Sequence, residues 1–213
     1  MTISNILKGG IEIGLKNFLS LVGALILYIL TIWIPYLNVG TTIAMVSIPA
    51  ALSRGQMISP TEIFDAKYRK NMGNFFLLMS FMFGGILIGY IFLVIPGIVL
   101  SYSWCLALLL LVDKGMNPMQ ALSESNERTY GHKWTIFFSY LALALGYMII
   151  NFLISYIGTD QACLEELYFM DGFAARSLCT ATWASVLQFI LILFYVPFQL
   201  GILAEVYKHL GGE

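Results

Sequence analysis

The sequence predicts an all-α integral membrane protein in which six membrane-spanning helices form three hairpins. Hydrophobic residues make up 59% of the chain and charged residues 11%, far from the roughly 45–50% and 25% of soluble proteins. The charges are also clustered, which leaves uncharged stretches at 17–53, 71–112, 134–159 and 177–204. Because a helix needs about 20 apolar residues to cross hydrocarbon, the first two stretches each have room for two spans and the others for one.

The amino-terminal segment is predicted to be an amphipathic helix, with apolar residues at every fourth position and charged residues on another face. The apolar set is Ile3, Leu7, Ile11 and Leu15, and the charged set is Lys8, Glu12 and Lys16. Such a helix fits the headgroup layer of a bilayer, where apolar burial and nearby cations both favour binding. The alternative is a helix packed on the protein's own cytoplasmic face.

The first two uncharged stretches are each interrupted near the middle by residues that favour a turn. Pro35 lies within the first, and Pro96 and Gly97 lie within the second. Proline removes a backbone donor and glycine permits a turn, so we expect a hairpin break at each place. The predicted spans are 18–34, 37–53, 75–94, 97–112, 134–157 and 178–203.

Two loops between the spans are expected to contain short surface helices. The segment 59–62 has the pattern of a capping box, with Pro60 at the first helical position. Asn117 and Pro118 repeat this arrangement, and Gly131 lies where a helix would end in a left-handed conformation.

A surface helix followed by two spans therefore recurs with a period of roughly 57–60 residues. The repeat units are about 1–58, 59–116 and 117–213. Because each unit contains an even number of spans, the three units share one orientation. A pseudo-threefold arrangement within a single membrane domain, 1–213, follows as a hypothesis.

The basic residues predict the orientation, because lysine and arginine favour the cytoplasmic side of short loops. With the amino terminus inside, ten of the eleven basic residues lie on the cytoplasmic side, and both termini are cytoplasmic. Arg176 alone lies outside, in a segment that Cys163 and Cys179 bracket. An oxidising compartment would permit a disulfide between these two cysteines, but two unpaired small residues fit the sequence equally.

Signals for chemistry are sparse. No predicted span carries an ionisable residue at its centre, which argues against proton-coupled transport. Glu205 comes nearest, and we expect it at a solvated helix end. His132 and His209 are the only histidines and neither lies in a metal-binding spacing. The common catalytic motifs are absent as well, so the sequence predicts no catalytic residue, metal, cofactor or nucleic-acid partner.

Two sets of polar residues are candidates for function. The first set, uncharged and within the spans, would either line a polar path or form hydrogen bonds between helices. Its members are Asn151, Gln188, Gln199, Ser101 and Ser103. The second set, basic and cytoplasmic, would either contact lipid phosphates or a protein partner, or only fix the topology. Its members are Lys67, Arg69, Lys70, Arg128, His132 and Lys133.

Three short segments resemble a known family. The segments 94–98, 121–125 and 131–134, with their Pro-Gly break and Gly-His-Lys-Trp entry, are similar to uncharacterised six-span bacterial membrane proteins. Those proteins are related to the membrane domain of some glycerophosphodiester phosphodiesterases. The likeness covers about residues 75–140 and implies a bacterial inner membrane. It carries over no catalytic residue, because the chain contains no phosphodiesterase domain.

The first functional hypothesis is a non-enzymatic membrane protein that organises lipid or anchors a partner, including a second copy of the chain, at the cytoplasmic membrane. The alternative is a pore or facilitator for a small neutral or weakly polar solute. A third hypothesis is an enzyme that acts on lipid at the cytoplasmic surface.

Overall fold

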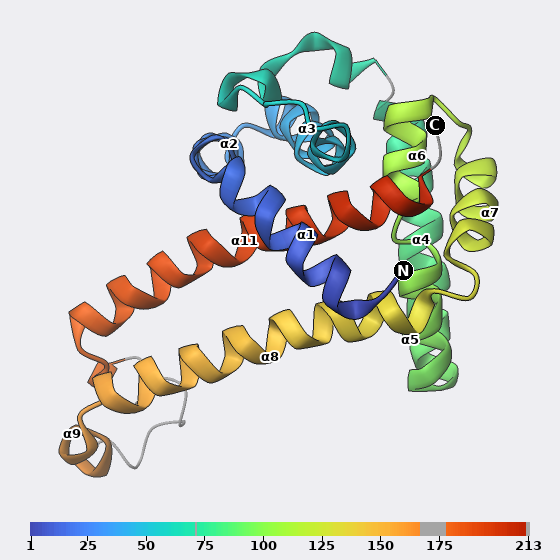
Figure 1. Cartoon of the computed structure of the whole chain (residues 1–213). Helices are drawn as coiled ribbons and strands as arrows, with labels where there is room; N and C mark the ends of the chain where they lie inside the picture. Colours follow the sequence, from blue (N-terminus) through green and yellow to red (C-terminus); the bar gives the residue numbers. More distant parts are fainter. Residues whose placement is uncertain (71, 167–177, 212–213) are drawn as a thin grey trace. The chain divides into compact units, whose positions relative to one another are not determined.

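Every regular element is helical in the computed structural model, which describes residues 1–70, 72–166 and 178–211 (Figure 1). The long elements and their bounds are α1 (Ile3–Lys16), α2 (Phe18–Thr31), α3 (Pro35–Ser53), α4 (Met72–Phe92), α5 (Val94–Ser103), α6 (Ala107–Lys114), α7 (Pro118–Thr129), α8 (Lys133–Gly158) and α11 (Thr182–Leu210). Three shorter elements are the 3-10 helices η1 (Pro60–Phe64) and η2 (Ala66–Arg69), and the helix α9 (Gln161–Glu166).

Several of these helices are long and apolar enough to cross a membrane. Five qualify in the described part of the chain, namely α3, α4, the run from α5 through α6, α8 and α11. A sixth is present if α1 and α2, which meet at an angle of 74°, form one bent span. The chain is therefore an all-α membrane protein.

The two predicted hairpin breaks differ in detail. Pro35 is the first residue of α3, as a proline at a helix start should be. In the second hairpin the turn is at Leu93, whose extended backbone separates α4 from α5. Pro96 and Gly97 then lie in the first turn of α5, so the break precedes them. Gly97 is needed there because a Cβ would lie 2.5 Å from the ring of Tyr90.

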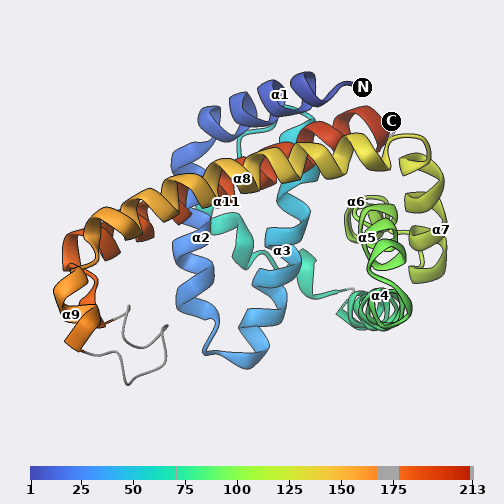
Figure 2. The same cartoon turned by 90° about the horizontal axis from the view of Figure 1, so that it is seen from below.

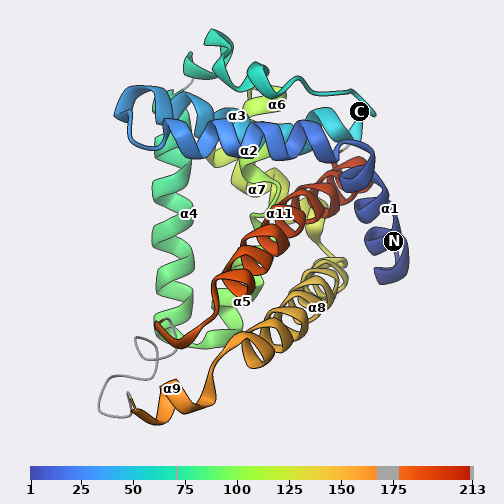
Figure 3. The same cartoon turned by 90° about the vertical axis from the view of Figure 1, so that its left-hand side faces the viewer.

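The chain forms two compact units, residues 1–140 with 197–213, and residues 141–196. In the first unit α2 and α3 lie side by side, and η1 and η2 run along them (Figures 2 and 3). Their shared core is apolar and includes Leu21, Met45, Ile48, Ile63 and Ala204. The same unit packs α4 against α5, and α6 against both α3 and α7.

The fourth predicted span is interrupted between α5 and α6. The break leaves backbone groups of Ser103 and Leu106 without helical partners, and Ser125 of α7 bonds to both. Its Oγ donates to the Ser103 carbonyl over 2.7 Å and accepts from the Leu106 amide over 3.2 Å. Thr129 adds a hydrogen bond to the same carbonyl. Because a buried backbone group left unpaired is costly, α7 stabilises this break.

Glycines hold α1 against the end of α11. Gly10 and Gly14 are buried, and a Cβ on Gly10 would lie 2.7 Å from the Ile202 side chain and 2.8 Å from its backbone. A Cβ on Gly201 would overlap the carbonyl oxygen of Gly10. Figure 2 shows the two segments side by side. The predicted apolar stripe is on another side of α1, where Ile3, Ile11 and Leu15 remain exposed. α1 therefore packs on the protein and still presents an apolar face outward.

One of the two predicted surface helices formed as expected. The Asn117 side chain accepts the Gln120 amide over 2.8 Å and begins α7, and Gly131 follows the helix with φ +79°. The prediction of a capping box at 59–62 is wrong. The Ser59 hydroxyl bonds to the Thr61 hydroxyl and caps no amide, so the segment forms two 3-10 helices. Asp65 separates them and its side chain accepts the Lys67 amide.

The second unit contains the larger part of α8, the first half of α11, and α9. Cys163 and Cys179 form a disulfide, which resolves the alternative that the sequence left open. Thr159 and Thr180 pair as an isolated bridge near it. Arg176 lies outside the described residues.

The glycine contact predicts a steric penalty at α1. Gly10→Ala should lower the free energy of unfolding by about 1–3 kcal/mol, because the added methyl group meets the backbone of Ile202. Gly84→Ala, in the interior of α4 with no atom within 4 Å of the added group, is the matched control. It should stabilise by roughly 0.5–1 kcal/mol through helix propensity. Unfolding in detergent micelles measures both, and equal effects would contradict the close contact.

The disulfide predicts a labelling pattern. The chain has three cysteines, of which Cys105 is the free one in the structure. Unfolded without reductant, each chain should therefore react with one maleimide, and with reductant it should react with three. Mass spectrometry of the intact chain counts the labels. Three labels before reduction would show that Cys163 and Cys179 are not joined.

Candidate functional site

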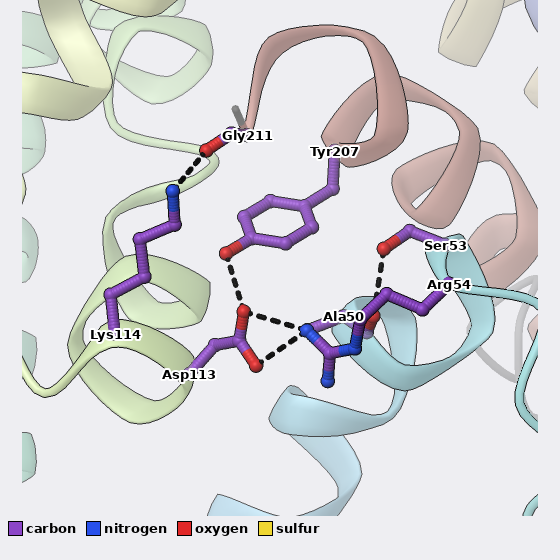
Figure 4. Close-up of polar contacts among 7 residues, drawn as sticks. All are labelled: Ala50, Ser53, Arg54, Asp113, Lys114, Tyr207 and Gly211. Carbon is purple, nitrogen blue, oxygen red and sulfur yellow. Dashed lines mark hydrogen bonds and ion pairs between the residues drawn. The ribbon is translucent and has the colours of Figure 1, made fainter. Parts of the chain in front are cut away.

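Three helix ends meet at one carboxylate. Arg54 follows the last residue of α3, while Asp113 and Tyr207 lie in the last turns of α6 and α11. The Arg54 Nη1 donates to the two oxygens of Asp113 over 2.8 and 2.9 Å, and the Tyr207 hydroxyl donates to Oδ2 over 2.8 Å (Figure 4). Asp113 thus joins its own helix to residues 59 and 94 positions away in sequence. We call these three residues the junction.

Two cations bind the carboxyl end of α11 beside the junction. Lys114 donates to the Gly211 carbonyl over 2.8 Å, and Arg128 donates to the carbonyls of Leu210 and Gly211. Cations are favourable here because the last carbonyls of a helix have no internal partners and carry partial negative charge. Arg128 also pairs with Glu124 over 2.7 Å. This predicted headgroup contact is therefore engaged within the protein.

A cavity of about 330 Å³ lies next to the junction, which we call the junction cavity. Its lining includes the apolar side chains of Ile43, Phe75 and Leu111. Its polar lining comes from the ends of α3 and α6 and from the segment that carries η1 and η2. The polar residues are Ser47, Arg54, Gln56, Glu62, Lys67, Tyr68 and Asp113.

Lys67 is paired on the wall of this cavity. Its ammonium lies 2.8 Å from Glu62 and 3.5 Å from Asp65, and 4.8 Å from the centre of the Tyr68 ring. The hydrogen bond to Glu62 raises the pKa of Lys67 above its ordinary value. The backbone amide of Lys67 lowers the pKa of Asp65. Lys67 therefore stays positively charged on the lining of the cavity at neutral pH.

A second cavity, of about 450 Å³, lies between α1 and the ends of α3 and α11. Glu205 lines it and is only 6% exposed, so the expectation of a solvated helix end is wrong. Gly9 makes this burial possible, because a Cβ there would lie 2.5 Å from the Glu205 carboxyl carbon. The carboxylate lies 3.7 Å from the Lys208 ammonium and 3.5 Å from the His209 ring.

The other predicted basic residues are distributed separately. Arg69 packs its side chain over Gly40, and Lys70 is exposed. Lys133 donates to the Asn126 side chain over 2.8 Å, and His132 is half-buried. Of the six predicted basic contacts, Lys67 is the one that lines a cavity described above.

The predicted polar interior does not coincide with either cavity. Ser101 and Ser103 donate to carbonyls of their own helix, Gly97 and Val99, over 2.9 and 2.7 Å. Asn151 and Gln188 are half-buried within the second unit, and Gln199 is half-buried in the first. The five residues line neither the junction cavity nor the second cavity.

The sequence interpretation missed Arg54, Asp113 and Tyr207. The sequence did contain a sign of their position, because each lies just after the uncharged stretch that ends a predicted hairpin. It also missed the Gly10 and Gly14 pair, whose spacing is the small-xxx-small pattern of close helix crossings.

Comparison of the chain with protein-family models, curated proteins and solved structures found no match.

The junction predicts coupled stability effects. Tyr207→Phe should destabilise by about 1 kcal/mol, because it removes the hydrogen bond to Asp113. In an Asp113→Ala background the same change should have almost no effect, because the acceptor is already gone. Tyr130→Phe, at a highly exposed tyrosine, is the matched control. A double-mutant cycle by thermal unfolding measures the coupling, and additive losses would contradict it.

Proposed function

We propose that the chain is a non-enzymatic membrane protein that organises anionic lipid at the cytoplasmic surface. The observation that carries this proposal is the position of α1, which bends by 74° from α2 and exposes an apolar stripe. We take α2, with the turn that follows it, as a short span of its own that requires a locally thinned bilayer. In that case α1 is not part of a bent span, and at 74° to α2 it runs close to the membrane plane. Interfacial amphipathic helices have this orientation.

The composition of α1 supports the same role. Leu15 is 55% exposed and is accompanied on its stripe by the exposed Ile3 and Ile11. Lys8 and Lys16 are also exposed. Burial of the stripe among acyl chains and attraction of the lysines to lipid phosphates would act together, the latter by about 1 kcal/mol for each cation at the surface.

The proposed topology has six spans in three hairpins, with both termini in the cytoplasm. It is supported by the order of elements, because α1, the η1–η2 segment and α7 each precede one pair of long helices. Arg54, Asp113 and Tyr207 then each lie within three residues of the carboxyl end of one pair. This correspondence is what a threefold internal repeat predicts. The resemblance to six-span bacterial proteins supports a bacterial inner membrane.

Lipid preference should change with the charge of α1. In vesicles of mixed phosphatidylcholine and phosphatidylglycerol, Lys8→Gln with Lys16→Gln should weaken association with the anionic lipid by up to about five-fold for each lysine. Glu12→Gln, an exposed change of opposite sign on the same helix, should strengthen it. Electron spin resonance of spin-labelled lipids measures the preference.

A depth measurement completes this test. In a Cys105→Ala background, a nitroxide at Leu15→Cys should be relaxed mainly by oxygen, because it lies among acyl chains. One at Lys16→Cys, which is exposed and lies about 100° around the helix axis from Leu15, should be relaxed mainly by a nickel chelate in water. Unchanged lipid preference in every charge variant, together with equal water access at both labels, would overturn the proposal.

A further inference from the structure

We infer that the junction cavity binds a ligand that carries both a phosphate and an ammonium group, the chemistry of an ethanolamine phospholipid headgroup. The inference deepens the proposed function by assigning a headgroup to the cytoplasmic face. Only the lipid source of the ligand rests on that function, because a soluble compound with the same two groups would fit the same cavity.

The charge balance of the cavity favours a dipolar ligand. Arg54 and Lys67 contribute two positive charges, and Glu62 and Asp113 contribute two negative charges. A simple anion would be attracted by the two cations and repelled by the two carboxylates, and a simple cation would experience the reverse. A ligand with two opposite charges can place each beside its complement, and so gains from both.

The exposure of the four groups orients that ligand. The acidic side chains are less exposed, Asp113 at 17% and Glu62 at 33%, whereas Arg54 is 48% and Lys67 51% exposed. The ammonium group therefore enters first, and the phosphate stays near the mouth. The ring of Tyr68 lines the same cavity and already attracts the Lys67 ammonium, so it can also attract the ligand's ammonium.

The cations retain capacity for a phosphate. In the described interactions Arg54 uses Nη1 alone to bond to Asp113, although a guanidinium has five N–H donors. The remaining donors suit the oxygens of a phosphate. The pair of Lys67 with Glu62 is exposed on one side, and such pairs are weak. A ligand can therefore replace it without unfolding the segment.

The volume limits the size of the ligand. About 330 Å³ is near the lower end of small-molecule pockets. It accommodates a headgroup but not acyl chains, which would have to remain outside. The ligand is accordingly a lipid headgroup, or a free compound of the same size and charge.

Titration calorimetry of the full chain in detergent tests the site with O-phosphoethanolamine as the probe. Inorganic phosphate and ethanolamine, used separately, are the two half-ligands. The intact zwitterion should bind at least about ten-fold more tightly than either half, because it makes charge-assisted bonds at both ends. Equal affinity for phosphate alone would overturn the inference.

Variants locate the binding. Glu62→Gln should weaken binding of the zwitterion by about ten-fold through loss of a charged acceptor, and Tyr68→Leu should weaken it by removing the ring. Glu124→Gln is the matched control, because that carboxylate is also 33% exposed and ion-paired but lies outside the cavity. Thermal unfolding checks that each variant is folded. Unchanged affinity in both cavity variants would overturn the site.

Vesicles distinguish the two sources. If the ligand is a lipid, spin-labelled phosphatidylethanolamine should be enriched around the chain, and Glu62→Gln should abolish this while Lys8→Gln with Lys16→Gln leaves it intact. Binding of the soluble compound without lipid enrichment upholds the cavity and assigns a free ligand. Absence of both overturns the inference, whatever the outcome for α1.

Discussion

Hydrocarbon is the solvent for most of this chain, and it excludes charge from the long helices. The charged residues must therefore be at helix ends and in the loops between them. The junction follows directly from this constraint. Where α3, α6 and α11 reach the end of their apolar stretches, Arg54, Asp113 and Tyr207 meet and satisfy one another. The position of the two cavities beside these helix ends has the same origin.

The same solvent explains the glycine contact. Apolar helices gain little by leaving lipid for one another, so their association depends on close packing and hydrogen bonds. Gly10 and Gly201 bring the backbones of α1 and α11 together where side chains would keep them apart. This approach also covers Glu205, because Gly9 leaves space for its carboxylate. The burial of Glu205 near the end of α11 thus depends on α1, a helix that the sequence predicts to lie outside the membrane core.

Much of the fold could be predicted because the spans are long and uncharged. Several predicted spans end within a few residues of the observed helices, as for 134–157 against α8, but 97–112 is divided between α5 and α6, and α11 extends seven residues beyond the predicted 203. Local signals were less reliable. The pattern at 59–62 indicated a capping box, but Ser59 bonds to Thr61, and tertiary packing along α2 and α3 gives 3-10 turns. The residues at 59–62 alone cannot show that this segment packs along α2 and α3.

The candidate site was less predictable for a related reason. The sequence identified Lys67 as basic, but its role depends on Asp113 and Arg54, which folding brings from other hairpins. Burial of Glu205 likewise depends on a residue almost two hundred positions away. The sequence of a single segment shows which residues carry charge and of which sign. The partner of each charged side chain depends on which helix ends the fold brings together. The local signals that could have indicated such contacts were the spacing of Gly10 and Gly14 and the position of the junction residues just beyond uncharged stretches.

Structural and binding roles coincide at Asp113. Its carboxylate joins three helix ends and is also the least exposed of the four charged groups that line the junction cavity. A cation alone would compete with Arg54 for this carboxylate and so weaken the connection. A zwitterion would instead supply a phosphate to Arg54 as its ammonium approaches Asp113, so that every group keeps a partner. Charge complementarity of this kind permits a ligand to bind at a structural junction without separating the helices that form it.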